Sequence, residues 1–307
     1  MLALILNIVF SSAFILLIKW AQVRETEDEI TFGAINYIVA AIAILPFFLL
    51  YQPEKISTGA IWAGASMGLI YFLTYFLVIF AMRKIGAAST TVVSVMSILV
   101  PIVFAAIYYR EMPTGLQMAG IALALVSLIL VGLRFDDDSS IEKAKVDSSA
   151  EQANATHDWR TSIFDSDLWV PLILFLFFLL CGLSRIAQEA FKHLVELDQQ
   201  PAQRATFGVA AFVTAATPSI LVLIFRKKKI RASEFGFGFA MGISNILQTL
   251  LILAALQQYK GFIVFPVTSA GGVVLIALVA SAILGEKLSR GTVVGISISV
   301  VAVFLLQ

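Results

Sequence analysis

Two amide side chains, Asn245 and Gln248, lie three residues apart in an otherwise apolar stretch of the sequence, residues 235–259. Side chains three or four residues apart share one face of an α-helix, and Ser244 falls on the same face as Gln248. An amide in an apolar environment costs several kcal/mol unless it is hydrogen-bonded. This face therefore either bonds to a neighbouring helix or lines a path for a polar solute.

The segment FPVTSAGG (265–272) is a second unusual feature, because it interrupts a run that otherwise reads as membrane helix. Pro266 has no N–H, so a carbonyl one turn earlier loses its partner. Such backbone persists in a membrane only against other helices or a water-filled cavity. Thr268 and Ser269 supply hydroxyl groups at the same level. Close helix packing and a polar cavity explain this segment about equally well.

A comparable segment, STTVVSVMSILVP (89–101), also combines hydroxyls, Ser94 among them, with a helix-breaking proline, Pro101. Because equivalent helices of the two halves both contain a proline and hydroxyl residues, we favour the cavity interpretation over packing. Pro46 and Pro218 are two further helix-breaking prolines within apolar runs.

Other polar or aromatic side chains within apolar runs are candidates for contact with a solute. Asn36 is an amide of the second run, and Tyr71 and Tyr75 lie in the third, where they either pack in the core or hold an apolar part of the solute. The candidate cavity residues are Asn36, Tyr71, Tyr75, Ser94, Asn245, Gln248, Thr268 and Ser269.

Arg185 and Glu189 are ionisable residues near the end of an apolar run. Their spacing of four allows them to pair along one helix face. An ionisable pair within a membrane suggests a functional role, and Glu189 is the candidate proton carrier for ion or proton coupling. The alternative is that both side chains reach the membrane surface.

The sequence offers little for catalysis or metal binding. His157 and His193 lie outside the apolar runs, and the single cysteine, Cys181, lies inside one. GASMG (64–68) matches the G-x-S-x-G motif of serine hydrolases, but it lies in an apolar run, where its glycines form a packing face between helices. We therefore expect no enzyme, cofactor or metal site, and the net charge of +1 argues against a nucleic-acid partner.

The spacing of charged residues along the chain indicates the helices that must position these side chains. The chain has 307 residues, of which 60% are hydrophobic and 13% are charged. Ten uncharged runs of 17 to 27 residues approach the ~20 residues that cross a membrane as a helix. We predict ten transmembrane helices at 1–18, 30–53, 56–82, 85–109, 112–133, 168–184, 205–225, 235–259, 261–285 and 291–307.

The polar segment 134–167 divides these runs five and five, and its composition predicts a flexible acidic linker. The two halves, 1–133 and 168–307, also resemble each other: a shift of 175 aligns Gly86 with Gly261, and a shift of 172 aligns Pro46 with Pro218. An odd number of spans inverts the second copy. We therefore predict an all-α polytopic membrane protein with two inverted five-helix repeats, as in many secondary transporters.

These features together resemble the drug/metabolite transporter superfamily, EamA-type branch. A glycine–glutamate signature closes the fourth span of each half; it reads LGEKLSRG (284–291) in the second half, and YYREMPTG (108–115), with Arg110 in place of glycine, in the first. The resemblance implies transport of a small organic solute, in some members in exchange for protons. We interpret Glu111 and Glu286 as fold determinants, since a carboxylate at such a helix end can accept hydrogen bonds from the next helix.

The sequence therefore predicts a secondary active transporter in the cell membrane, with a small-molecule solute and the lipid bilayer as its partners. Alternating access between two inverted halves would move the solute. A membrane channel or a non-transporting scaffold is the alternative, and an intramembrane enzyme is the least favoured reading.

Overall fold

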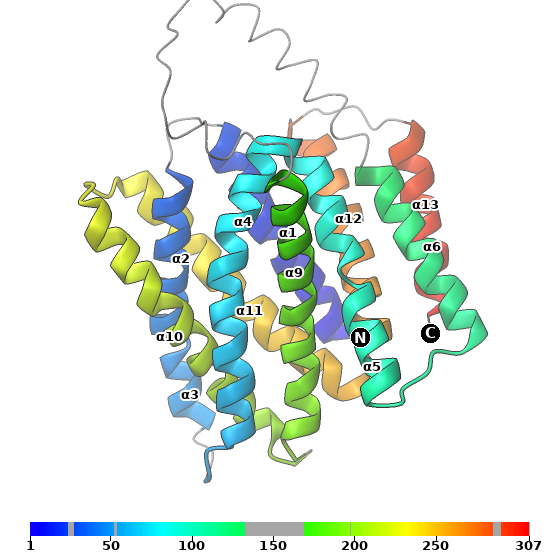
Figure 1. Ribbon diagram of the computed structural model, residues 1–307, viewed down its shortest axis with the longest axis horizontal. Helices are drawn as coiled ribbons and strands as arrows, with labels where there is room; N and C mark the ends of the chain where they lie inside the picture. The colour runs from blue at the N-terminus through cyan, green and yellow to red at the C-terminus, as the bar shows by residue number, and fades with distance from the viewer. Residues whose placement is uncertain (24–27, 52–53, 133–168, 197, 285–289, 307) are drawn as a thin grey trace, which may run out of the picture.

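The computed structural model describes residues 1–306 except 24–27, 52–53, 133–168, 197 and 285–289. The described part is all helical, without a strand (Figure 1). Its helices are α1 (Leu2–Val23), α2 (Glu29–Ala43), α3 (Leu45–Tyr51), α4 (Thr58–Met96), α5 (Leu99–Tyr108), α6 (Gly115–Gly132), α9 (Trp169–Leu194), α10 (Gln200–Arg226), α11 (Ala232–Gln258), α12 (Gly261–Leu284) and α13 (Arg290–Leu305).

Six of the helical segments are long and apolar enough to cross a membrane, and four more apolar helices are shorter. The six are Glu29–Tyr51, Thr58–Ala81, Val170–Leu194, Gln200–Arg226, Ala232–Gln258 and Gly261–Val279. The shorter ones are Leu2–Ile18, Val93–Tyr108, Gly115–Ser127 and Val293–Leu305. The predicted linker, residues 134–167, lies outside the described residues. These helices indicate a multi-pass integral membrane protein.

Helix α4 differs from the sequence expectation, because it joins two predicted spans. Its 39 residues would measure about 58 Å if straight, almost twice the ~30 Å of the hydrocarbon core. Figure 1 shows α4 turning at one end of the bundle and returning towards the other end, where α5 follows. The turn is made within continuous helix, so no loop marks it in the sequence.

The four prolines occupy two kinds of position. Pro46 is the second residue of α3, directly after the break from α2, and Pro101 is the third residue of α5, after the break from α4. Pro218 and Pro266 lie inside α10 and α12, both of which continue as α-helix beyond them. Neither of these two prolines ends its helix.

Glycine pairs bring helices into backbone contact. On α4, a Cβ at Gly64 or Gly68 would collide with the carbonyl oxygens of Phe207 and Ala211 on α10. This confirms that the glycines of GASMG form a packing face. On α11, a Cβ at Gly238 would lie 2.9 Å from the carbonyl oxygen of Phe32 on α2. A Cβ at Gly242 would lie 2.8 Å from the carbonyl oxygen of Asn36, also on α2.

Helices from the two ends of the chain interleave throughout the bundle. Helix α1 packs on α11 and α12, α4 packs on α9 and α10, and α6 packs on α13. The α6–α13 contact stands at one edge of the bundle in Figure 1 and includes a hydrogen bond between the Ser127 and Ser299 hydroxyls. The interior between α2, α4, α9 and α11 is therefore built from both ends of the sequence.

Candidate functional site

The amides predicted from the sequence meet in the interior. Asn245 Nδ2 donates to Asn36 Oδ1 across the α2–α11 contact at 3.4 Å, and Asn245 Oδ1 accepts from Gln248 Nε2 at 3.0 Å. Asn7 Nδ2 of α1 donates to the Gln248 carbonyl oxygen at 2.7 Å. Asn36 and Asn245 are buried and Gln248 is half-buried. The Asn36 Nδ2 group is buried with no partner among the described residues.

Tyr71 is the second centre of polar contacts. Its hydroxyl accepts a hydrogen bond from Gln188 Nε2 of α9 at 3.1 Å, and its carbonyl oxygen accepts one from the Tyr37 hydroxyl at 2.9 Å. Thr249 of α11 lies beside the Tyr71 hydroxyl. Tyr71 therefore contacts α2, α9 and α11 from its place on α4.

Tyr75 plays a different part from Tyr71. Its ring covers Gly33 of α2, where a Cβ would collide with it, and its hydroxyl donates to the Glu29 carbonyl oxygen at 2.7 Å. Tyr75 is buried and stands edge-on to Tyr37, with the ring centroids 6.0 Å apart. These contacts fix the start of α2.

Arg185 of α9 does not pair with Glu189 in the structure, although their spacing allows it. Its Nη1 donates to the Ser94 carbonyl oxygen at 3.1 Å and to the Ser97 hydroxyl, at the end of α4. The break between α4 and α5 leaves carbonyls there without helical partners, and a cation at a helix C-terminus also offsets the helix dipole. Arg185 therefore has its partners at the α4–α5 break because the fold places this break beside α9.

Glu189 lies one turn further along α9 and faces a different set of groups. Its carboxylate is buried against the backbone of Gly261, where a Cβ would collide with Oε2. Lys192 Nζ and His193 Nε2 are each 3.8 Å from Oε1, which is too long for a hydrogen bond. Lys192 Nζ also lies 4.0 Å from Glu111 Oε1.

This arrangement links the two predicted carboxylate functions. The candidate proton carrier Glu189 and the predicted fold determinant Glu111 share one lysine at the end of the α9 span. Glu286, the second predicted fold determinant, lies outside the described residues.

The two α12 hydroxyls that were predicted to line a cavity, those of Thr268 and Ser269, do not join the hydrogen bonds between helices described above. Thr268 is buried, and its hydroxyl donates to the Val264 and Phe265 carbonyl oxygens of its own helix, at 2.8 and 3.2 Å. Ser269 is half-buried. A threonine hydroxyl that donates to the carbonyls of the preceding turn makes only a local hydrogen bond. Within the described residues, Thr268 therefore makes no hydrogen bond to another helix.

We use the name central polar layer for the interior residues of α2, α4, α9 and α11 that are connected in this way. It comprises Asn36, Tyr71, Arg185, Gln188, Asn245, Gln248 and Thr249. Besides Asn36 Nδ2, the Thr249 hydroxyl is buried with no hydrogen-bond partner of good geometry among the described residues. Native interiors leave few such groups, so the Asn36 amide and the Thr249 hydroxyl are available to bond water or a solute.

Sequence reasoning missed Gln188 and Asn7. Gln188 follows Arg185 by three residues, the same spacing that identified Asn245 and Gln248, but it lies beyond the uncharged run. Asn7 is a single amide in the first run, and only its contact with α11 gives it significance.

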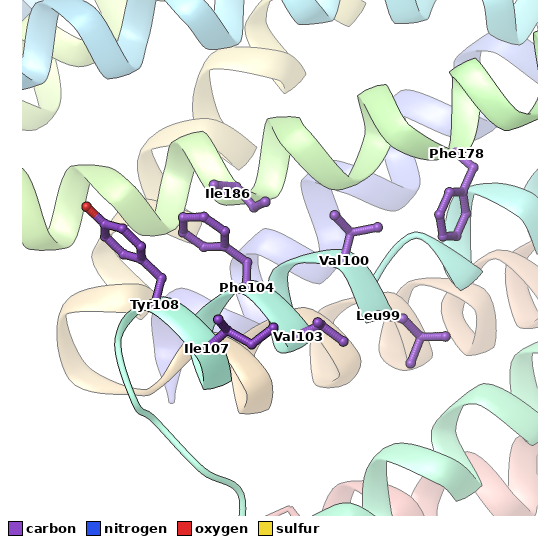
Figure 2. A pocket seen from close by; sticks show the side chains of 8 residues that line it. All are labelled: Leu99, Val100, Val103, Phe104, Ile107, Tyr108, Phe178 and Ile186. Atoms are coloured by element: carbon purple, nitrogen blue, oxygen red, sulfur yellow. The ribbon is translucent and has the colours of Figure 1, made fainter.

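An apolar groove of about 510 Å³ lies away from the central polar layer, between α5 and α9 (Figure 2). Its lining is apolar apart from the Tyr108 hydroxyl, and none of the predicted cavity residues borders it. The residues are Leu99, Val100, Val103, Phe104, Ile107, Tyr108, Phe178 and Ile186. In a membrane, such a surface suits lipid chains.

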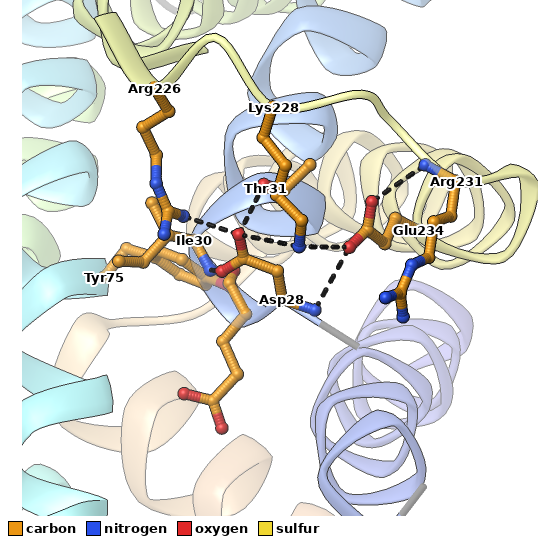
Figure 3. A network of polar contacts seen from close by, with 9 residues as sticks. Asp28, Ile30, Thr31, Tyr75, Arg226, Lys228, Arg231 and Glu234 are labelled. Carbon is orange, nitrogen blue, oxygen red and sulfur yellow. Dashed lines mark hydrogen bonds and ion pairs between the residues drawn. The ribbon is translucent and has the colours of Figure 1, made fainter. Parts of the chain in front are cut away.

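A charged network joins α2, α10 and α11 at one end of the bundle (Figure 3). Asp28 Oδ2 contacts Arg226 Nη1 at 2.6 Å and Lys228 Nζ at 3.3 Å, and Lys228 Nζ lies 3.0 Å from Glu234 Oε1. Partial burial acts to raise the pKa of Asp28, but hydrogen bonds from Arg226 and Thr31 outweigh it and lower the pKa from 3.8 to about 2.

Comparison with known proteins agrees with the class that the fold defines. Residues 1–133 match the family model of the EamA-like transporter family, which belongs to the drug/metabolite transporter superfamily. The predicted resemblance is thus confirmed for the first half of the chain, and the match indicates a membrane transporter of this type.

Similarity to solved structures concerns the fold alone. A solved structure titled "Crystal structure of protein" matches with a TM-score of 0.69 at 15% sequence identity, covering 99% of this chain and 94% of that chain. In all, 28 chains of solved structures match significantly. No curated protein matches the sequence significantly.

Proposed function

We propose that the protein is a secondary active transporter of a small organic solute, working by alternating access between two inverted five-helix halves, residues 1–133 and 168–307. The segment 134–167 joins them, and the cell membrane is its location. One observation carries the proposal: the hydrogen bonds of the central polar layer cross between the two halves. These are Asn36–Asn245, Tyr71–Gln188 and Ser94–Arg185.

The helix contacts support an inverted repeat. If α1, α2, α4, α5 and α6 correspond in order to α9, α10, α11, α12 and α13, a two-fold axis in the membrane plane relates the contacts in pairs. The α4–α10 contact then corresponds to α11–α2, α4–α9 to α11–α1, and α1–α12 to α9–α5. All six contacts are present, as the symmetry requires.

The glycine contacts support the same relation at single residues. A shift of 174 relates Gly64 and Gly68 to Gly238 and Gly242. Their partner carbonyls are related by a shift of 175, from Phe32 and Asn36 to Phe207 and Ala211. Four backbone contacts thus form two matched pairs, and the motifs themselves read GASMG and GFAMG.

Rocking of one half against the other would break the cross-half hydrogen bonds. The Asn36–Asn245 bond of 3.4 Å is at the long limit for a hydrogen bond, so little is lost when a polar solute replaces it. A solute that bonds to Asn36, Asn245 and Gln248 would be held at the interface that moves.

The proposal is tested by flux measurements on the full-length protein in proteoliposomes. A transporter gives saturable uptake and counterflow, and Asn245→Ala reduces both for the transported solute. Thr217→Ala is the matched control, because the exposed Thr217 hydroxyl bonds only to its own helix, at the Val213 carbonyl oxygen.

A channel is the second candidate function, and its flux would neither saturate in this way nor show counterflow. A scaffold would give no flux of any solute. Either result would end the transport proposal.

A further inference from the structure

We propose that Arg185 is the binding residue for the carboxylate of a small organic monoanion, which is the solute class of the central polar layer. The inference deepens the proposed function and rests on it for the transport of that anion, whereas binding itself is testable separately.

Arg185 uses only one edge of its guanidinium in the structure. Both of its hydrogen bonds, to the Ser94 carbonyl oxygen and the Ser97 hydroxyl, are donated by Nη1. Nε and Nη2 donate to none of the described residues. An arginine carries five N–H donors, and those on Nε and Nη2 form one fork that matches both oxygens of a carboxylate.

The charge of Arg185 has no acidic partner within the described residues. The ion pairs of this region involve Lys192 and His193, and the titratable neighbours of Arg185 are Tyr71 and Cys181. A cation deep among membrane helices is costly and normally pairs with an anion or with backbone carbonyls. Here the two bonds at the end of α4 satisfy part of the guanidinium, and no carboxylate of the described residues balances its full charge.

The surroundings of Arg185 suit the binding of a solute carboxylate. Arg185 and Tyr71 are half-buried and so retain accessible surface, although they contact neighbouring helices from inside the bundle. The Tyr71 hydroxyl, held by Gln188, supplies a further polar group close to the cation.

The number of charges favours a carboxylate over a phosphate monoester. Arg185 supplies one positive charge, which a carboxylate balances with one negative charge. A phosphate monoester carries about two negative charges at neutral pH and would leave a net charge in a low-dielectric site.

The test uses purified full-length protein in detergent and measures thermal unfolding with two matched pairs of probes, benzoate with benzamide and butyrate with butyramide, at constant ionic strength. A ligand that binds only the folded protein raises the Tm by mass action. We expect at least one carboxylate to raise the Tm of the wild type by a few degrees more than its amide does.

Two variants assign the effect to Arg185, and a third is the control. Arg185→Gln should abolish the difference between carboxylate and amide. Arg185→Lys keeps the charge but lacks the fork, so it should weaken the apparent affinity by about tenfold or more and serves where Arg185→Gln does not fold. Arg204→Gln should keep the difference, because Arg204 lies on α10, outside the central polar layer.

Three results would overturn the assignment: equal shifts with carboxylate and amide, an unchanged difference in both Arg185 variants, or stabilisation by inorganic phosphate but by neither carboxylate. Failure of the transport proposal has a different signature, namely Arg185-dependent carboxylate binding without counterflow of that carboxylate. Saturable counterflow of a neutral solute, equal in wild type and Arg185→Gln, together with no Arg185-dependent difference between carboxylate and amide, would remove the anion site and leave transport intact.

Discussion

At the scale of single residues, the identity of the partner decides what a polar side chain does. Arg185 and Glu189 are one helical turn apart, yet Arg185 bonds to the end of α4 while Glu189 faces Lys192, His193 and the backbone of Gly261. We therefore propose separate functions for the two residues, anion binding for Arg185 and proton coupling for Glu189, which mutation can separate.

Glu189→Gln tests proton coupling. The carboxylate is buried, and Lys192 Nζ lies 3.8 Å from Oε1, so we propose that it gains and loses a proton during transport. We expect the variant to lose stimulation of uptake by a pH gradient while counterflow of the same solute persists, both measured in proteoliposomes.

The control for this experiment is Glu54→Gln, which removes an exposed carboxylate near the start of α4 and should behave as the wild type. Gradient-driven uptake that survives in Glu189→Gln would exclude this residue from the coupling step.

Asp28→Asn tests the charged network of Figure 3. The folded-state pKa of about 2 lies below the ordinary aspartate value of 3.8, so the ionised carboxylate stabilises the fold above pH 3.8, and this contribution is lost as the pH falls towards 2. We expect the variant to be less stable than the wild type at pH 7 by about 1 kcal/mol, after allowance for solvent screening.

The difference in Tm between wild type and Asp28→Asn should shrink between pH 4 and pH 2, a window that follows from the values 3.8 and about 2. Asp198→Asn, at an exposed aspartate, is the control and should show no such pH-dependent difference. A constant difference across this range would contradict the role of Asp28.

At the scale of helices, close packing depends on a few glycines. Gly64 and Gly68 let α4 approach the backbone of α10, and Gly238 and Gly242 do the same for α11 and α2. These contacts hold together helices from both halves, and small residues at such contacts are the usual material of membrane helix packing.

Gly68→Ala tests this packing. Its Cβ would collide with the backbone carbonyl of Ala211, which cannot rotate away as a side chain can. We expect a loss of stability of about 1–3 kcal/mol, measured by thermal or denaturant unfolding in detergent.

Gly236→Ala on α11 is the matched control, because its Cβ would meet no atom within 4 Å. This variant should be neutral or stabilised by up to about 1 kcal/mol through helix propensity. If the two variants lose stability equally, the glycine contact does not hold α4 on α10.

At the scale of the whole molecule, alternating access requires that the interface between the halves opens to water. In this structure Asn245 and Thr268 are buried, whereas Gln248 and Ser269 are half-buried. If the protein works by alternating access, it has to change conformation before water reaches all four side chains from one side of the membrane.

Cysteine accessibility tests this motion. In a Cys181→Ser background, we expect Gln248→Cys and Ser269→Cys to react with a water-soluble thiol reagent faster than Asn245→Cys and Thr268→Cys. Transported solute should change the rates, because it shifts the population of conformations.

The reference is an exposed loop position, Glu54→Cys, which should react regardless of solute. Complete protection of all four interior positions, with and without solute, would leave these polar groups the role of joining helices only.

The sequence by itself determined that the chain is an all-helical membrane protein and which polar residues lie within its apolar runs. Hydropathy is a property of local composition, so the apolar segments and the candidates Asn36, Tyr71, Asn245 and Gln248 could be read directly. The family resemblance was also available from local motifs and was confirmed for residues 1–133.

Only the tertiary structure decided which of these residues meet. It separated Arg185 from Glu189, joined two predicted spans into α4, added Gln188 to the central polar layer and kept Thr268 within its own helix. The physical reason is that a hydrogen bond between helices depends on which helix faces are adjacent, and this depends on backbone contacts such as Gly242 with Asn36, made by residues more than 200 positions apart.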